Sequence, residues 1–374
     1  MQDFLDKKAY FFGFSRWKHG FVKPFFWEYD NRNIIFVNPI FTTHKKLALK
    51  KGLDANSHIY IWGKKKFDAI EHFAKEHNLK LFRVEDGFIR SVGLGSDLTQ
   101  PYSLVVDDEG IYFDPTTPSL LENILLNLQP DAALLERARK LKERIVADKI
   151  SKYNADAHAT LDFPKEKKTA LVVGQVEDDA SIIFGAEGMT NKELLQKVKT
   201  LYPDRYIIYK PHPDVLSGNR KGHLPTQEAL HYCDTIVTHV GMASVLRAVD
   251  EVHTMSSLTG FEGLLHGKEV FTYGVPFYAG WGLTTTHTEH LLDAAHTLKR
   301  RNVLRTLDEL VAATLLLYPR YIHPTDKKRC EAEEMIEALK QQKEMLASSF
   351  WRRVQFTFYV YLSRILQKLF SLVA

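Results

Sequence analysis

The sequence predicts an α/β protein with two Rossmann-like domains facing a central cleft, followed by a C-terminal amphipathic helix. Two observations predict this class: short β-rich runs alternate with helical patterns in both halves, and a polar stretch at 156–168 separates the halves. At 374 residues the chain is long enough for two packed cores. We place the N-terminal domain at 1–165, the second domain at 166–330 and C-terminal helices at 331–374.

The first half begins its alternation near residue 33. Strand-like runs at 33–39, 58–63 and 79–87 flank a helical pattern at 66–78, which is typical of βαβ units with a parallel sheet. The segment 101–114 predicts a β-hairpin, because Asp108-Glu109-Gly110 supplies turn residues between two apolar runs. Two helices with polar faces are expected over 117–150.

The second half repeats the pattern. Strands are expected at 169–176, 205–213, 234–240 and 269–275, with a helix at 191–202 between the first two. In open α/β sheets, ligands bind beyond the carboxyl ends of the strands. The polar motifs of this half all follow predicted strands, so we expect them to form a binding site.

Composition narrows the class of protein. Apolar residues make up 45% and charged residues 26%, which is ordinary for a folded domain, and a net charge of +4 gives no reason to expect nucleic-acid binding. The cysteines, Cys233 and Cys330, match no metal or redox spacing and fit a reducing cytoplasm. No apolar run is long enough for a transmembrane helix.

The C-terminal segment 350–374 has a distinct composition. It contains four basic residues and no acidic one, and aromatic and aliphatic residues fill most of its other positions. This pattern predicts an amphipathic helix in an anionic membrane interface; a helix docked on the cytosolic fold is the alternative.

Three groups of polar residues follow strands of the second half. Glu177, Asp178 and Asp179 come directly after 169–176, where a solvated turn is one explanation. The second group, Lys210 and His212, lies in a loop stiffened by two prolines and offers donors to a phosphate. The third group precedes a helix expected to begin near Gly260, whose N-terminus would bind an anion. Its members are Ser256, Ser257 and Thr259, with Glu262 expected in the first turn, either capping the helix or binding a ribose.

These motifs, in this order, resemble a known family. The segments GQVEDDASI, KPHPDV, SSLTGFEGLLHGK and YGVPFYAGWGLT, preceded by VEDGFIRSVGLGSDL, are similar to the retaining β-Kdo transferases of bacterial capsule assembly, of the KpsC type. The likeness covers about residues 55–325 and implies a GT-B-like fold with CMP held in the C-terminal domain. Family members commonly carry two such modules, and this chain has room for one.

The resemblance implies roles for individual residues. Asp179 matches the catalytic carboxylate, a competent nucleophile toward an oxocarbenium-like carbon in a double displacement. His212 would neutralise charge on the CMP phosphate or the sugar carboxylate. The remaining donor-site candidates are Lys210, Ser256, Ser257, Thr259, Glu262 and Gln175.

An acceptor base is expected from the opposite domain. Glu85 is our candidate, with its neighbour Asp86 and a purely structural role as alternatives. Arg90 would hold an anionic acceptor or the Kdo carboxylate, or form a salt bridge to Asp86. The aromatic residues Tyr273, Tyr278 and Trp281 would line the donor site or pack in the core.

The predicted activity is transfer of Kdo from CMP-Kdo to a surface polysaccharide or its glycolipid linker. We expect no cofactor and no metal, no nucleic-acid partner, and a peripheral location on the cytoplasmic face of the inner membrane of a Gram-negative bacterium. The alternatives are a CMP-sialic-acid-type transferase and a non-catalytic scaffold for capsule assembly.

Overall fold

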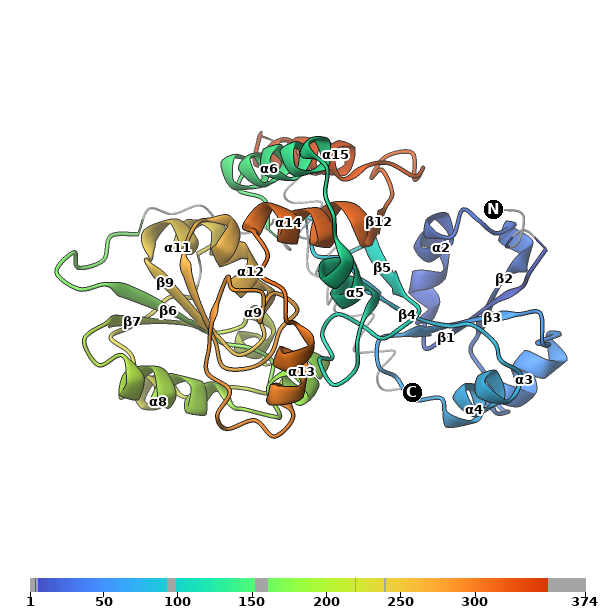
Figure 1. Cartoon of the computed structure of the whole chain (residues 1–374), viewed down its shortest axis with the longest axis horizontal. Coiled ribbons are helices and arrows are strands. Elements are labelled where there is room, and N and C mark those ends of the chain that lie inside the picture. Colours follow the sequence, from blue (N-terminus) through green and yellow to red (C-terminus); the bar gives the residue numbers. More distant parts are fainter. Residues whose placement is uncertain are drawn as a thin grey trace. The chain divides into compact units, whose positions relative to one another are not determined.

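The computed structural model describes residues 4, 6–92, 99–151, 161–218, 220–238 and 240–348. The chain divides into two compact units (Figure 1). Unit 1 comprises Met1–Ile111 and Tyr318–Ala374, and unit 2 comprises Tyr112–Leu317. The division therefore falls at 111–112 rather than at the polar stretch near 165, because the helices at 120–147 pack with the segment 307–317 of unit 2.

Unit 1 is built on a mixed sheet with the strand order β12-β5-β4-β3-β1-β2. Its strands are β1 (Ala9–Phe12), β2 (Ile34–Val37), β3 (His58–Trp62), β4 (Leu81–Asp86), β5 (Ser103–Asp107) and β12 (Pro319–Tyr321). The first four run parallel, whereas β5 lies antiparallel to both β4 and β12. This order resembles the flavodoxin-like arrangement, whose ligand site lies between the carboxyl ends of β1 and β3.

Both faces of this sheet are covered, which explains the apolar runs of its central strands. One face packs Phe11, Tyr60 and Trp62 with residues of α2, and the other packs Tyr10 and Phe12 with residues of α3 and α4. The helices are α2 (His19–Val22), α3 (His44–Lys50), α4 (Asp68–Glu76) and α15 (Ala332–Ser348), with the 3₁₀ turns η1 (Arg16–Lys18), η2 (Lys23–Phe25) and η3 (Asn31–Asn33).

Unit 2 carries a fully parallel sheet with the order β11-β10-β9-β6-β7-β8. Its strands are β6 (Thr169–Val173), β7 (Tyr206–Lys210), β8 (Thr235–Ile236), β9 (Glu251–Thr254), β10 (Glu269–Thr272) and β11 (Thr285–Thr286). Numbered within the unit, this is the 3-2-1-4-5-6 order of the Rossmann fold. The strand order reverses between β6 and β9, and ligands bind at such a switch point.

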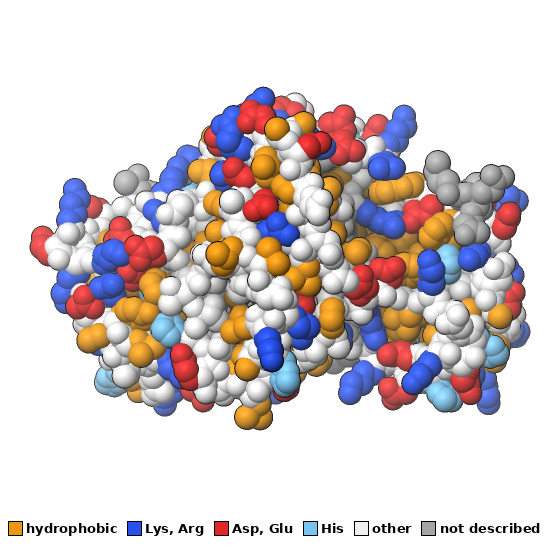
Figure 2. All heavy atoms as spheres, in the orientation of Figure 1, with side chains coloured by type: hydrophobic (Ala, Val, Ile, Leu, Met, Phe, Trp, Pro, Cys, Tyr) orange, Lys and Arg blue, Asp and Glu red, His pale blue; other side chains and the backbone are white. Residues whose placement is uncertain are grey.

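The helices of unit 2 connect these strands and extend beyond the sheet (Figure 1). They are α5 (Leu120–Asn127), α6 (Ala132–Ala147), α7 (Ala180–Gly185), α8 (Asn191–Leu201), α9 (Pro213–Leu216), α10 (Thr226–Ala229), α11 (Met242–Ala248), α12 (Leu258–Leu265), α13 (Ala294–Arg300) and α14 (Leu307–Val311), followed by the π-helical turn η5 (Ala312–Leu317). On the face shown in Figure 2, acidic and basic side chains are interspersed.

A buried ion-pair cluster stabilises the start of β9. Glu251 is fully buried and lies 3.0 Å from Arg205 Nε, 3.1 Å from Lys168 Nζ and 3.4 Å from His253 Nε2. Burial alone would raise the pKa of this carboxyl, but hydrogen bonds from His253, Arg205 and Lys168 outweigh it and lower the pKa to about 2. The ionised form of Glu251 is therefore part of the folded state.

Several sequence predictions need correction. The hairpin at 101–114 is wrong, because β5 pairs with β4 and β12, and the described residues 110–113 form no strand. Strands β1 and β9 were not anticipated.

The predicted two helices over 117–150 are confirmed as α5 and α6. Among described residues, no helix is long and apolar enough to cross a membrane. The predicted helix at 350–374 lies outside the described residues.

Candidate active site

Gln175 organises the switch point of unit 2. It follows β6, is 4% exposed, and its Oε1 accepts hydrogen bonds from the amides of Ser256 and Ser257 at 3.0 and 3.1 Å and from Thr254 Oγ1 at 3.1 Å. The backbone amide of Gln175 donates to Asn191 Oδ1 at 2.8 Å. The side chain therefore joins the loop after β6 to the loop after β9, and its carbonyl oxygen is directed at protein groups.

The start of α12 is held by its own residues. Ser257 is the N-cap, and its Oγ accepts from the Thr259 amide at 3.1 Å. Helix α12 begins at Leu258, two residues before the expected start, so Glu262 lies in the second turn and does not cap the helix. Gln175 already occupies the amide of Ser257. The backbone amides of Ser257 and Thr259 therefore already have acceptors within the protein, and an anion at this loop would lie next to side-chain hydroxyls.

The acidic triplet after β6 divides into three different environments. Glu177 Oε1 accepts from the Asn191 amide at 2.8 Å, and Asp178 forms an exposed ion pair with Arg220 at 3.0 Å. Asp179 is the N-cap of α7: its Oδ1 accepts from the amide of Ser181 at 3.0 Å and from the Ser181 hydroxyl at 2.7 Å. Residues 177–178 therefore form a turn with Asp178 exposed, and hydrogen bonds of Glu177 and Asp179 fix its structure.

Asp179 is linked to the serine loop through Ser181. The Ser181 carbonyl accepts from Ser256 Oγ at 2.8 Å, and Gln175 Nε2 donates to the same hydroxyl at 3.3 Å. Within the described part of the chain, the hydrogen bonds to the Asp179 carboxylate all use Oδ1. Oδ1 thus fixes this half-buried side chain, and Oδ2 takes no part in these bonds.

Lys210 is the last residue of β7 and His212 follows the strand, on the other side of β6 from the serine loop. Lys210 is 6% exposed and its Nζ donates to the Val240 carbonyl at 2.7 Å. His212 caps α9, because its Nδ1 accepts from the Asp214 amide at 3.1 Å. In the neutral ring this leaves the proton on Nε2, which is then a donor. His212 therefore fits the predicted phosphate contact better than the buried Lys210 does.

The three aromatic candidates pack in the core. Tyr273, Tyr278 and Trp281 are all fully buried. Tyr278 donates to the Ser257 carbonyl at 2.5 Å, and a Cβ on Gly260 would collide with its ring and hydroxyl. Of the two roles expected from the sequence, the structure gives these side chains the packing role, through which Tyr278 supports the serine loop.

In unit 1, the predicted residues lie at and after the carboxyl end of β4. Glu85 Oε1 accepts from the Asp86 amide at 3.0 Å, and Glu85 Oε2 lies beside Gly63 at the end of β3. Arg90 is 1% exposed, and its guanidinium donates to Asp86 at 2.7 Å and to Ser91 Oγ at 3.0 Å. The salt bridge, one of the two roles considered for Arg90, is present.

Lys18 is a residue that the sequence analysis missed. Its ammonium lies 3.1 Å from the ring centroid of Trp62, at the switch point between β1 and β3. Burial lowers its pKa to about 8, with Arg90 and Lys65 acting in the same direction and the carboxylates of Asp86 and Glu85 opposing it. A lysine with a pKa of about 8 therefore lies near Glu85 and Asp86, the candidates for the acceptor base. No motif in the surrounding sequence identifies Lys18 as a site residue. Its position follows only from the adjacency of β1 and β3 in the sheet.

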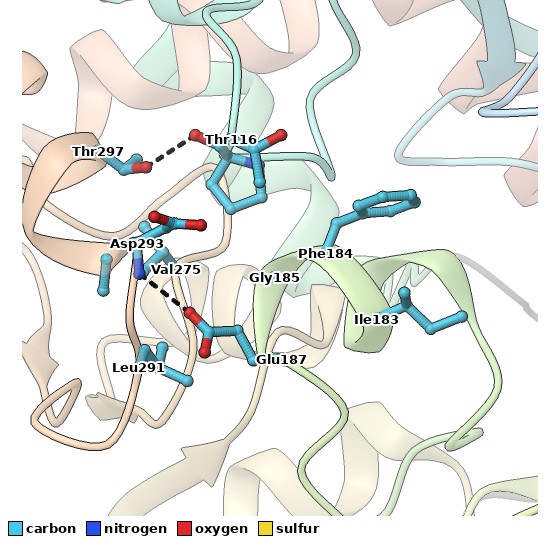
Figure 3. Close-up of a pocket in the computed structure, with 11 residues that line it drawn as sticks. Thr116, Ile183, Phe184, Gly185, Glu187, Val275, Leu291, Asp293 and Thr297 are labelled. Carbon is cyan, nitrogen blue, oxygen red and sulfur yellow. Dashed lines mark hydrogen bonds between the residues drawn. The ribbon is translucent and has the colours of Figure 1, made fainter.

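A small cavity of about 140 Å³ lies in unit 2 at the C-terminal end of α7 (Figure 3). Its wall includes Phe184, Val275 and Thr297, and across it Glu187 accepts a hydrogen bond from the Asp293 amide at 3.1 Å. None of the predicted site residues lines it. In the described ranges, no group of three or more His, Cys, Asp or Glu residues is arranged to hold a metal ion.

Comparison with known proteins gives a consistent picture. The family model described as capsule polysaccharide biosynthesis protein matches residues 57–321. The capsule polysaccharide modification protein LipA of Neisseria meningitidis serogroup A is 45% identical over 92% of this chain and 47% of its own length. The lipopolysaccharide-processing protein LpsZ of Rhizobium meliloti is 41% identical over 75% of this chain and 63% of its own. The chain thus spans about half the length of LipA.

Two solved structures from Thermosulfurimonas dismutans have the same fold. KpsC, titled β-Kdo 2,7 transferase, has a TM-score of 0.69 and 37% identity, covering 90% of this chain and 100% of its own. KpsC, titled β-Kdo 2,4 transferase, has a TM-score of 0.74 and 31% identity, covering 91% and 100%. These matches confirm the predicted α/β, GT-B-like fold class.

Proposed function

Because this chain belongs to the capsule polysaccharide biosynthesis protein family, we propose that it is a retaining glycosyltransferase that moves Kdo from CMP-Kdo to a surface polysaccharide or its glycolipid linker. The observation that carries the proposal is the position of Asp179. Its carboxylate is fixed through one oxygen at the switch point of a Rossmann-type sheet, next to hydroxyls suited to a phosphate.

On the donor side, Asp179 attacks the anomeric carbon of Kdo. A carbon–oxygen ester bond forms as the bond from that carbon to the phosphate of CMP breaks, and CMP leaves with the electron pair. His212 donates toward the charge that builds on the phosphate, and the loop that carries Ser256, Ser257 and Thr259 is assigned to the nucleotide. Gln175 holds the serine loop, and Glu262 is assigned to the ribose.

On the acceptor side, a hydroxyl oxygen of the acceptor attacks the same carbon and releases the Asp179 carboxylate. Its proton passes to a base, for which Glu85 is our candidate. Two inversions give net retention. Because Arg90 is buried against Asp86, Lys18 is the better-placed cation for an acidic group on the acceptor. The two KpsC structures are a β-Kdo 2,7 transferase and a β-Kdo 2,4 transferase, so we expect local acceptor contacts to decide the linkage.

A non-catalytic scaffold is the second candidate. One observation favours it: Asp179 is the N-cap of α7, a role that requires no catalysis. A CMP-sialic-acid-type transferase would use the same site with another donor. For the enzyme, we place the protein on the cytoplasmic face of the inner membrane of a Gram-negative bacterium, with residues 350–374 on anionic lipid. Deletion of 350–374 would then lower membrane partitioning without lowering transfer to a soluble acceptor.

Intact-protein mass spectrometry after incubation with CMP-Kdo tests the proposal. Wild type gains the mass of one Kdo residue and releases CMP, whereas Asp179→Ala gains nothing. CMP-sialic acid serves as the matched donor control and gives neither product. CMP release without an adduct would argue against a lasting covalent intermediate but keep the transferase. No release from either donor would favour the scaffold.

A further inference from the structure

The loop before α3 and the exposed face of α3 form an unusual surface in unit 1. We define the Phe41 surface by Ile40, Phe41, Lys46, Leu49, Lys50 and Lys51. Phe41 is 99% exposed, Ile40 is 69% exposed and Leu49 is 44% exposed. Single exposed apolar residues are common, but three around one short helix, including a fully exposed phenylalanine, need a physical reason.

Local structure holds these side chains outward. The loop leaves β2 after Val37, and Thr43 Oγ1 caps α3 by accepting from the Lys46 amide at 3.2 Å. Among the residues of α3, only Ala48 is fully buried. Lys46, Leu49 and Lys50 have the i, i+3, i+4 spacing of one helix face, and all three are exposed. Helices α3 and α4 cover the same side of the sheet (Figure 1). The exposed face of α3 therefore points away from that sheet.

The charge of this region has one sign. From Asn38 to Leu53 the sequence contains four lysines and no acidic residue. A Cβ on Gly52 would lie 3.0 Å from Lys8 Nζ, which adds a further ammonium at the end of α3. The next acid, Asp54, accepts from Ser57 Oγ at 2.8 Å and from the Asn56 amide at 3.0 Å within its own turn.

We infer that the Phe41 surface docks on an anionic phospholipid bilayer. Lysines attract the negative headgroups, and exposed Ile40 and Phe41 can enter the interface beyond the ammonium groups. A nucleic-acid backbone would use the lysines but leave the apolar side chains in water. This inference concerns unit 1 alone and does not depend on the proposed transferase activity or on residues 350–374.

Vesicle flotation of the full-length protein tests the inference. Phosphatidylglycerol-containing vesicles are compared with pure phosphatidylcholine vesicles, for wild type and for the double variant Ile40→Ser/Phe41→Ser. The double variant should bind anionic vesicles about tenfold more weakly or worse, from the apolar area withdrawn from the interface. The matched control is Leu292→Ser, which removes an 88% exposed leucine from unit 2 and should bind as wild type does.

A charge variant, Lys46→Gln/Lys50→Gln, separates the two contributions. It should lose most of the preference for anionic over neutral vesicles, and added salt should weaken wild type more than this variant. Residues 350–374 are present in every protein, so their contribution is constant. Unchanged vesicle binding of the Ile40→Ser/Phe41→Ser variant overturns the inference. An equal loss in Leu292→Ser also overturns it, as does a change in self-association instead of lipid binding.

Discussion

The two roles of Asp179, nucleophile and helix cap, can be separated by the choice of substitution. Asp179→Asn keeps an Oδ1 that can accept from the amide and hydroxyl of Ser181, but it removes the carboxylate charge. Asp179→Ala removes both. The pair therefore distinguishes a residue that only begins α7 from one that also attacks the donor.

The expected magnitudes differ for stability and for activity. Loss of an N-cap acceptor costs about 1 kcal/mol, so Asp179→Ala should lower the free energy of unfolding by that amount. Asp179→Asn should stay within about 0.5 kcal/mol of wild type, because Asn caps helices as well as Asp does. Both variants should lose adduct formation and reduce transfer by about 1000-fold or more, since the step needs an anionic nucleophile.

Urea unfolding gives the stability values, and CMP release with CMP-Kdo gives the rates. Binding of CMP, followed by calorimetry, should be retained in Asp179→Asn because the phosphate-side hydroxyls are unchanged. Transfer by Asp179→Asn at a rate near that of wild type would refute the nucleophile. Loss of activity in proportion to lost stability, seen in Asp179→Ala only, would show that the residue acts as a cap.

Three further predictions concern other parts of the chain. Because the pKa of Lys18 is about 8, kcat/KM for an acidic acceptor should fall as pH rises through 8 in wild type. Lys18→Arg should keep it level to higher pH, and identical profiles would exclude an ammonium role. Glu251 has a folded-state pKa of about 2, so its ionised form stabilises the fold at pH values above the ordinary pKa of a glutamate. This contribution is lost as the pH falls toward 2. Glu251→Gln should therefore lower the unfolding free energy at pH 7 by about 3 kcal/mol in urea titrations; a change below 0.5 kcal/mol at about pH 7 would contradict this. Gly260→Ala should cost about 1–3 kcal/mol by overpacking against Tyr278 and weaken CMP binding. Gly20→Ala in α2, with no atom within 4 Å of the added methyl group, should be neutral or slightly stabilising in the same thermal melts.

The sequence predicted those elements whose signal is local. Central strands such as β6 and β7 are continuous apolar runs bounded by turn residues, and their positions were found. Strand β9 was missed because EVHT places Glu251 and His253 in a buried strand, where only tertiary ion pairing makes them acceptable. Strand β1 was also missed, although its apolar run AYFF is as short and as local a signal as the run IIFV of β2.

The candidate site was predictable in its residue types but not in its connections. The pattern Asp179-Ala180-Ser181 before an apolar run is a helix N-cap signal, so the cap could have been found from the sequence. The hydrogen bonds from Ser256 and Ser257 to Gln175 join residues more than 80 positions apart along the chain and follow only from the pairing of β6 with β9. A resemblance to a family can assign residues to a site, but it does not show which of these residues are hydrogen-bonded to one another.

Those connections change how the donor site should be understood. Ser256 uses its amide on Gln175 and its hydroxyl on Ser181, whose amide in turn holds Asp179. The serine loop and the proposed nucleophile therefore belong to one hydrogen-bonded unit at the switch point, and a shift of either moves the other. For a reaction in which the leaving phosphate and the attacking carboxylate must lie on opposite sides of one carbon, this rigidity fixes their separation before the donor arrives. The same rigidity gives Gln175 a positioning role: it contacts neither reacting group in our proposal, yet it sets the distance between the groups that do.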